Sequence, residues 1–278
     1  YYVAGVTSPL SANITAAPVT ISGLTASNKV YDTTTAATLS GTPVISGGLL
    51  GSDTATLSGT ATIGTFASPN AASGIAVASN LSGLIISNPN YYIADVATGL
   101  TANITGKPVT ITASAQTTIY GTAITNLGTA AFTSTGFIGG DSVSAVTLTY
   151  VGSTSVAATV NAATYTGVIA PSNAVASSGT LLSNYAITYI GGNLVINPAA
   201  LTVNADAKVM TYAASSLPTL SYVVTGLKNG DTPFTGSLTT AATAYNGGVG
   251  SASNIGTYAI TQGTLSAGTN YTITYAPA

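Results

Sequence analysis

The chain of 278 residues has four lysines and six aspartates as its only charged side chains, and its formal net charge is −2. Charged residues make up 4% of the sequence, against about 25% in an average globular domain. Solubility therefore rests on Ser, Thr, Asn and the backbone. A chain of this kind lacks the basic patch that nucleic-acid binding requires, so we expect no nucleic-acid partner.

The residue types that carry most enzyme chemistry are missing or dispersed. His, Cys and Glu are absent, and the six aspartates are spread along the whole sequence. General acid–base and nucleophilic catalysis need such groups close together, and calcium needs several carboxylates. We expect no enzyme activity, no catalytic residue, no cofactor and no metal site. No apolar run approaches the ~18–20 residues of a membrane-spanning helix, so we also expect no membrane insertion.

The sequence repeats with a long period. A strand-like segment begins at Pro18, Pro108 and Pro198, which are 90 residues apart. An early Tyr, a Gly-rich turn with an Asp, and an Asn-Tyr strand then follow in constant order. These landmarks are Tyr31, Tyr120 and Tyr212; Asp53, Asp141 and Asp231; and Asn90, Asn184 and Asn270. Self-similarity of this length is typical of tandem domains, and it predicts three domains, at residues 18–107, 108–197 and 198–278.

Residues 1–17 match the end of a repeat. Residues 10–15 (LSANIT) correspond to residues 100–105 (LTANIT), a closing strand with Leu, Ala and Ile on one face. The third repeat reaches residues 275–278 without a counterpart of residues 193–197. Two hypotheses follow: residues 10–15 of one subunit complete the third repeat of the next, or the sequence is a window on a longer repeat chain. Intact mass distinguishes them.

Each repeat shows the alternation of half-buried antiparallel strands. Abundant Thr and Val favour this conformation, and no helical stripe interrupts it. The apolar residues expected to share one face are Ala55, Leu57, Ala61 and Ile63 in the first repeat, Val109, Ile111, Ala113 and Ala115 in the second, and Leu201, Val203, Ala205 and Ala207 in the third.

The Gly-rich turns separate strand-like runs at residues 48–54 (GLLGSDT), 136–142 (GFIGGDS) and 226–232 (GLKNGDT). Their glycines can adopt positive φ, and we expect the Asp side chain to accept backbone N–H groups in an Asx turn. In the Asn-Tyr strands, alternation at Tyr185, Ile187 and Tyr189 favours a ring in the core with its hydroxyl at the rim. Stacking of exposed tyrosines on sugars is the alternative.

At these residues the chain resembles the tandem YDG and MBG domains of very large secreted bacterial surface proteins, including filamentous-haemagglutinin-like adhesins. Residues 18–107 are similar to a YDG domain through KVYDTTT at residues 29–35. Residues 108–197 are similar to an MBG domain of the YGX type through Tyr120 and Gly121, and residues 198–278 to another MBG domain through VTGLKNGDT. The resemblance implies a β-rich, extracellular, repetitive stalk and carries over no catalytic residue.

Together these observations predict an all-β protein, an elongated tandem array of three small domains with an immunoglobulin-like sandwich or a β-grasp-like fold. The expected function is structural: a repeat segment of an extracellular bacterial adhesin, surface filament or biofilm-matrix fibre. We expect self-association head to tail, with strand donation as a route. Partners are then copies of the chain itself or adjoining repeats of a longer chain. The alternative is a carbohydrate- or ice-binding surface module, for which glycans are the partner.

Overall fold

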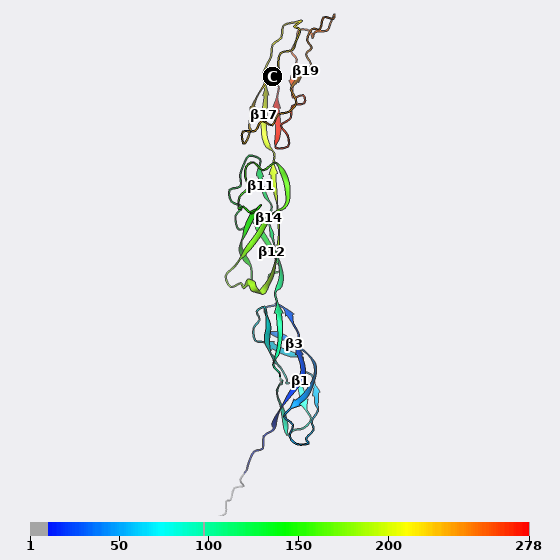
Figure 1. Cartoon of the computed structure of the whole chain (residues 1–278), viewed down its shortest axis with the longest axis vertical. Helices are drawn as coiled ribbons and strands as arrows, with labels where there is room; N and C mark the ends of the chain where they lie inside the picture. Colours follow the sequence, from blue (N-terminus) through cyan, green and yellow to red (C-terminus); the bar gives the residue numbers. More distant parts are fainter. Residues whose placement is uncertain (1–10, 97, 278) are drawn as a thin grey trace, which may run out of the picture. The chain divides into compact units, whose positions relative to one another are not determined.

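The computed structural model describes residues 11–96 and 98–277, and nearly all of its regular structure is β-strand (Figure 1). Among these residues the only helical segment is the 3₁₀ turn η1 (Leu182–Asn184), and no helix is long and apolar enough to cross a membrane. The chain divides into two compact units, which are described in turn. One comprises residues up to Val109, Gly136–Ser142 and Ser178–Ile187; the other comprises Thr110–Thr135, Val143–Ser177 and the residues from Thr188 on.

The first unit contains a seven-stranded mixed sheet in the order β2-β9-β6-β5-β3-β1-β8. Strand β1 pairs antiparallel with β3 and parallel with β8. A second, two-stranded sheet joins β4 and β7. The strands are β1 (Ala17–Ala26), β2 (Lys29–Val30), β3 (Ala36–Gly47), β4 (Leu57–Gly59), β5 (Ile63–Phe66), β6 (Ala72–Ser79), β7 (Leu84–Ile86), β8 (Tyr91–Val96) and β9 (Leu100–Thr105).

Strands β1 and β3 bend together where two glycines meet. Gly23 and Gly41 have φ values of +88° and +106°, and a Cβ atom on Gly41 would lie 2.1 Å from the carbonyl oxygen of Gly23. The register of the pair shifts at this point. Only glycine allows both the positive φ and the close backbone approach, so the two residues form a bulge that curves the sheet.

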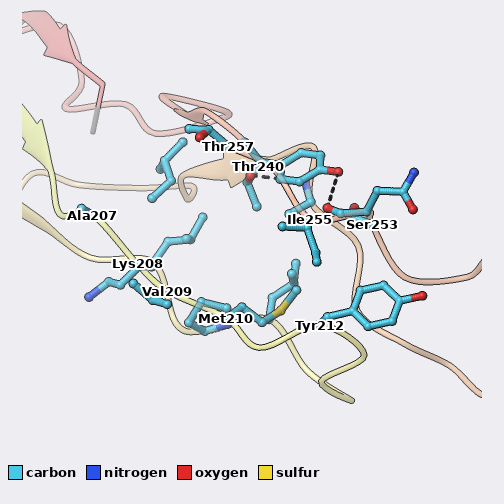
Figure 2. Close-up of a pocket in the computed structure, with 17 residues that line it drawn as sticks. Ala207, Lys208, Val209, Met210, Tyr212, Thr240, Ser253, Ile255 and Thr257 are labelled. Carbon is cyan, nitrogen blue, oxygen red and sulfur yellow. Dashed lines mark hydrogen bonds between the residues drawn. The ribbon is translucent and has the colours of Figure 1, made fainter.

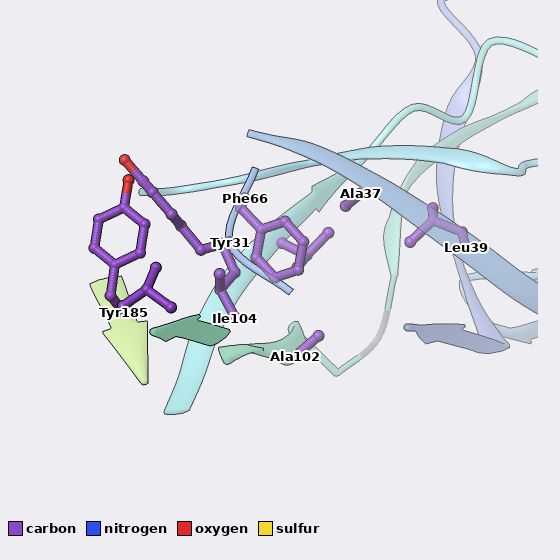
Figure 3. Packing of buried hydrophobic residues seen from close by; sticks show 9 residues of the cluster. Tyr31, Ala37, Leu39, Phe66, Ala102, Ile104 and Tyr185 are labelled. Carbon is purple, nitrogen blue, oxygen red and sulfur yellow. The ribbon is translucent and has the colours of Figure 1, made fainter. Parts of the chain in front are cut away.

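The first unit buries two hydrophobic clusters. One gathers around the ring of Phe66 and has Tyr31 and Tyr185 side by side at its edge (Figure 3). Its buried members are Tyr31, Ala37, Leu39, Phe66, Val77, Ala102, Ile104, Val109 and Tyr185. The other contains Ile21, Leu24, Ala61, Leu84 and Val96. In the first cluster, Ala37 with Leu39 and Ala102 with Ile104 come from alternate positions of β3 and β9, as the period-two pattern predicts. In the second, Ile21 and Leu24 are three residues apart, because the register of β1 shifts between them.

The expected single strand through Ala55, Leu57, Ala61 and Ile63 was wrong. The structure places β4 and β5 there, in different sheets. Gly59 ends β4 with a φ of +85°, and a Cβ on it would lie 2.1 Å from the carbonyl oxygen of Gly83. Because β4 ends at this residue and β5 joins another sheet, the two sides do not share one face: Ala61 is buried whereas Ile63 is exposed.

The second unit is built from four further sheets, whose strand orders are β11-β16-β14-β13, β12-β10-β15, β18-β17-β21 and β19-β20. Residues of β10 and β15 belong to both units. The strands are β10 (Lys107–Ala113), β11 (Gln116–Ile119), β12 (Phe132–Thr135), β13 (Val143–Tyr150), β14 (Ala163–Ala176), β15 (Tyr185–Ile190), β16 (Gly192–Asn197), β17 (Ala199–Ala205), β18 (Tyr222–Thr225), β19 (Thr239–Thr240), β20 (Ile260–Thr261) and β21 (Tyr271–Ala276).

Alternating burial in β10 and β17 agrees with the sequence pattern. The residues Val109, Ile111 and Ala113 are buried, and so are Leu201 and Val203. Ala115 and Ala207 lie beyond the strands and are exposed, so the predicted face ends earlier than expected. Val203 packs with Leu238, Ile260 and Leu265 in a hydrophobic cluster of the second unit.

Two repeats end in a closing strand that has the same two kinds of neighbour. Strand β9 lies between β2 and β6, and β16 lies between β11 and β14. Each closing strand runs parallel to the short strand before the early Tyr, with Val30 opposite Thr105 and Ile119 opposite Asn197. The closing strand therefore pairs the short strand, β2 or β11, with the rest of its sheet and covers one edge of β6 or β14.

Candidate functional sites at the repeat junctions

The three Gly-rich turns each bring an Asp to the tyrosine of the Asn-Tyr strand. The first glycines of the turns, Gly48, Gly136 and Gly226, have φ values of +96°, +99° and +102°, as the sequence predicted. The Asp side chains, expected to accept backbone N–H groups, accept tyrosine hydroxyls. The O–O distances are 2.6 Å for Tyr91–Asp53, 2.6 Å for Tyr185–Asp141 and 2.7 Å for Tyr271–Asp231.

These three tyrosines are buried, with their hydroxyls bound at the turn. The Tyr91 hydroxyl also accepts the backbone N–H of Leu50 at 3.1 Å, and that of Tyr271 accepts the N–H of Lys228 at 2.9 Å. Burial, followed by the bond to the carboxylate, raises the pKa of Tyr185 and that of Tyr271 to about 12. The ring of Tyr185 is in the core and its hydroxyl at the rim, as the alternation predicted. The same prediction was wrong for Tyr189, which lies four residues further along β15 and is 38% exposed.

The early tyrosine of the first repeat packs on this arrangement in the second repeat. The rings of Tyr31 and Tyr185 meet edge to face, with centroids 5.4 Å apart and an interplanar angle of 79°. Phe137 packs against the same ring at 4.7 Å. Tyr31 is only 7% exposed. Edge-to-face pairs contribute about 0.5–1.5 kcal/mol beyond the area that they bury.

The second and third repeats meet in the same way. The rings of Tyr120 and Tyr271 are 5.5 Å apart at an interplanar angle of 81°. The Tyr120 hydroxyl also donates to Asp231, at 2.8 Å. Tyr120 is 5% exposed. One carboxylate therefore accepts hydroxyls from two repeats.

An asparagine completes each junction. The side chain of Asn184 is 2% exposed; its Oδ1 accepts the backbone N–H of Ala71 at 2.8 Å, and its Nδ2 donates to Oδ1 of Asn70 at 3.1 Å. At the next junction Asn270 accepts the N–H of Ala162 at 2.8 Å and donates to Asn161 at 3.0 Å. We call each Tyr–Tyr–Asp group with its pair of asparagines a junction.

Sequence reasoning missed Asn70 and Asn161. A weak signal was present, because Asn-Ala-Ala begins at both residues and Asn-Ile-Gly begins at Asn254. The structure supports the match of Asn254 with Asn161. The carbonyl oxygen of Asn161 accepts the hydroxyl of Tyr165 at 3.0 Å, and that of Asn254 accepts the hydroxyl of Tyr258 at 2.9 Å.

The third early tyrosine differs from the other two. Tyr212 is 61% exposed. It lies beside a cavity of about 520 Å³ that is bordered by residues 207–212 and 253–258, and neither segment forms a strand. Figure 2 shows the segment with Lys208, Val209 and Met210 along one side of this cavity and Thr240 and Thr257 along another. In the first two repeats, the closing strand lies between the equivalent segments.

The described residues offer little for other chemistry. No three His, Cys, Asp or Glu side chains lie close enough there to hold a metal ion. The ion pair between Lys29 and Asp32, 2.7 Å apart, belongs to a surface turn that also includes Thr34. The junctions and the open cavity are therefore the sites around which a function can be argued.

The repeated junctions and strands define a tandem-repeat protein of small β domains. The model of the MBG domain (YGX type) matches residues 109–195 and 201–278, and that of the YDG domain matches residues 15–98. The chain belongs to the MBG domain (YGX type) family and carries a YDG domain ahead of its two MBG domains. No curated protein and no solved structure matches it. Domains of these kinds in tandem indicate a repeat module of a surface protein.

Proposed function

We propose that the chain is a structural repeat segment of an extracellular bacterial adhesin or surface filament, without enzyme activity. The observation that carries this proposal is that the same kinds of side chain recur at both junctions. Each combines an edge-to-face pair of tyrosines, a partly buried carboxylate that accepts a tyrosine hydroxyl, and a pair of asparagines. Recurrence of the same contacts between successive domains supports a structural role for the segment.

The segment also associates head to tail. The open cavity of the third repeat takes a closing strand, because its two bordering segments match those that hold β9 and β16. In the second repeat, Ile196 lies opposite Thr118 on one side and Ala163 on the other. The equivalent neighbours in the third repeat are Met210 and Gly256, and both line the cavity.

Residues 11–16 fit this position. They form no strand in the structure, and Ile14 is fully exposed. Its counterpart in β9, Ile104, is 2% exposed, and Ala102 is also buried. Leu10, the first residue of the expected donor strand, lies outside the described residues. In our proposal a second copy places Ile14 between Met210 and Gly256. A closing strand of an adjoining repeat would occupy the same cavity in a longer polypeptide.

Sedimentation velocity and electron microscopy of the whole chain test this proposal. Wild-type chains should form species that grow with concentration in low and high salt, because the contacts are almost uncharged. Ile14→Asp should abolish the growth of these species, because it places a charge between apolar neighbours. The conservative variant Ile14→Val should retain it. Ile85→Asp is the matched control, since Ile85 is exposed and lies outside the proposed contact.

Two results would contradict the proposal. A chain that stays monomeric at high concentration in both salts would refute self-association. Growth that survives Ile14→Asp would refute strand donation. Saturable binding to a glycan array by monomers would instead support the carbohydrate-binding alternative.

A further inference from the structure

We infer that a third junction forms between copies: Tyr212 and Asn254 of one copy bind Asp53 and Asn90 of the first repeat of a second copy. This inference rests on the proposed head-to-tail association and assigns residues to it. Tyr212 and Asn254 border the cavity that takes the donor strand, whereas Asp53 and Asn90 lie in the first repeat, outside that strand. The two internal junctions supply the template.

The third repeat carries one half of such a junction. Tyr212 corresponds to Tyr31 and Tyr120, which are 7% and 5% exposed, yet it is itself 61% exposed. Asn254 corresponds to Asn70 and Asn161, which accept an amide from the following repeat. The residue after it, Ile255, is 92% exposed. Its backbone N–H takes the place of the Ala71 and Ala162 donors.

The first repeat carries the other half. Asn90 is exposed, whereas its counterpart Asn184 is 2% exposed in the first junction. Asp53 is exposed, and its carboxylate holds the Tyr91 hydroxyl as Asp231 holds that of Tyr271. Leu50 is 65% exposed, although its counterpart Ile138 packs against the hydrophobic cluster around Phe66.

Chain spacing makes the two contacts compatible. The closing strand β9 ends at Thr105 and β10 begins two residues later; β16 ends at Asn197 and β17 begins two residues later. Strand β1 also begins two residues after Thr15, the last residue of the proposed donor. A donor strand in the cavity therefore delivers the first repeat of its copy to the place that the next repeat occupies at the internal junctions.

Disulfide cross-linking tests the assignment, because the chain has no native cysteine. One whole chain carries Asn254→Cys and another carries Asn90→Cys, and the two are mixed and oxidised. We expect a hetero-dimer band that the Asn246→Cys and Asn90→Cys mixture lacks. The intramolecular pair Asn161→Cys with Asn270→Cys is the positive control for geometry. Tyr212→Ala should in addition weaken wild-type association about tenfold, which corresponds to an edge-to-face pair and one hydroxyl contact.

The possible results distinguish failure of the third junction from failure of head-to-tail association itself. The third junction alone would be overturned by a combination of three results. Asn254→Cys and Asn90→Cys would cross-link no more than the Asn246→Cys control, the Asn161–Asn270 control would form its disulfide, and association would still be lost in Ile14→Asp. Absence of both association and cross-links would overturn both. Unchanged association of Tyr212→Ala would also count against the junction.

Discussion

Replacing Asn184 with leucine should open the first junction at one identifiable amide. Asn184→Leu keeps the approximate volume but removes the acceptor for the Ala71 N–H, 2.8 Å away, and the donor to Asn70. Leaving a desolvated N–H unpaired costs about 1–3 kcal/mol, and the lost bond to exposed Asn70 adds less. We expect a net loss of about 2 kcal/mol, and about 30-fold faster exchange of the Ala71 amide hydrogen.

Hydrogen exchange followed by NMR at a concentration where the chain is monomeric measures this effect at single residues. Asn90→Leu is the matched control, because Asn90 stands at the same place in the first repeat but is exposed within one chain. The Ala162 amide, bound by Asn270, provides an internal reference in either variant. Unchanged exchange of Ala71 in Asn184→Leu would refute the assignment of Asn184 as the residue that fixes this junction.

The tyrosine hydroxyls, the Tyr120 ring and the glycine bulge between β1 and β3 each make a measurable contribution to stability. Melting temperature should be nearly constant from about pH 5 to pH 9 and fall between about pH 10 and pH 12. The pKa values of Tyr185 and Tyr271 are raised to about 12, so their contribution is present below pH 10 and lost as they ionise; a flat alkaline limb would contradict this. Tyr120→Phe removes the hydroxyl donor to Asp231 but keeps the ring, so it should lower the free energy of unfolding, measured with denaturant, by about 1 kcal/mol. Tyr120→Ala removes the ring as well and should lower it by about 3 kcal/mol or more. Equal losses would contradict that division. Gly41→Ala should lower the free energy of unfolding by about 2 kcal/mol or more, because Gly41 has a positive φ and lies close to the carbonyl oxygen of Gly23. Gly99→Ala should leave it nearly unchanged in the same denaturant titration, since Gly99 has open space around it.

In acid, the melting temperature should stay constant down to about pH 5. Although burial opposes ionisation, hydrogen bonds from Lys29 and Thr34 lower the pKa of Asp32 to about 2. A lowered carboxyl pKa stabilises the fold above the ordinary value of 3.8 and loses its effect as pH falls towards 2. This contribution is therefore already complete at pH 5.

Sequence periodicity correctly predicted the strands in which every second residue is buried. Val109, Ile111 and Ala113 are buried as expected, because a strand with one buried face imposes period two on its sequence. The rule failed between Ala55 and Ile63, because β4 ends at Gly59, whose φ is +85°, and β5 joins a different sheet. The alternation of apolar and polar residues continues through this glycine, so the sequence alone does not show where the strand ends.

The recurring Tyr, Asp and Asn residues were recognised as repeats from the sequence, but their contacts with one another were not predicted. Each Asp was assigned to its own turn, since a local Asx bond is the common use of Asp beside glycine. The structure joins it to a tyrosine about 40 residues further along the same repeat, and at the second junction also to Tyr120 of the preceding repeat. Contacts over such distances in the sequence leave no trace in local spacing. The recurrence of Asn-Ala-Ala at Asn70 and Asn161 was the available sign.

The most direct test of head-to-tail association uses a synthetic fluorescent peptide of residues 8–17. The acceptor is the whole Ile14→Asp chain, whose own donor segment is disabled while the cavity beside Met210 is intact. We expect a saturable rise in fluorescence anisotropy at one peptide per chain, and no rise for the peptide that carries Ile14→Asp. We also expect the bound peptide to protect the amide hydrogens of Met210 and Gly256 from exchange. Equal binding of both peptides, or no binding of the native one, would refute head-to-tail association by strand donation.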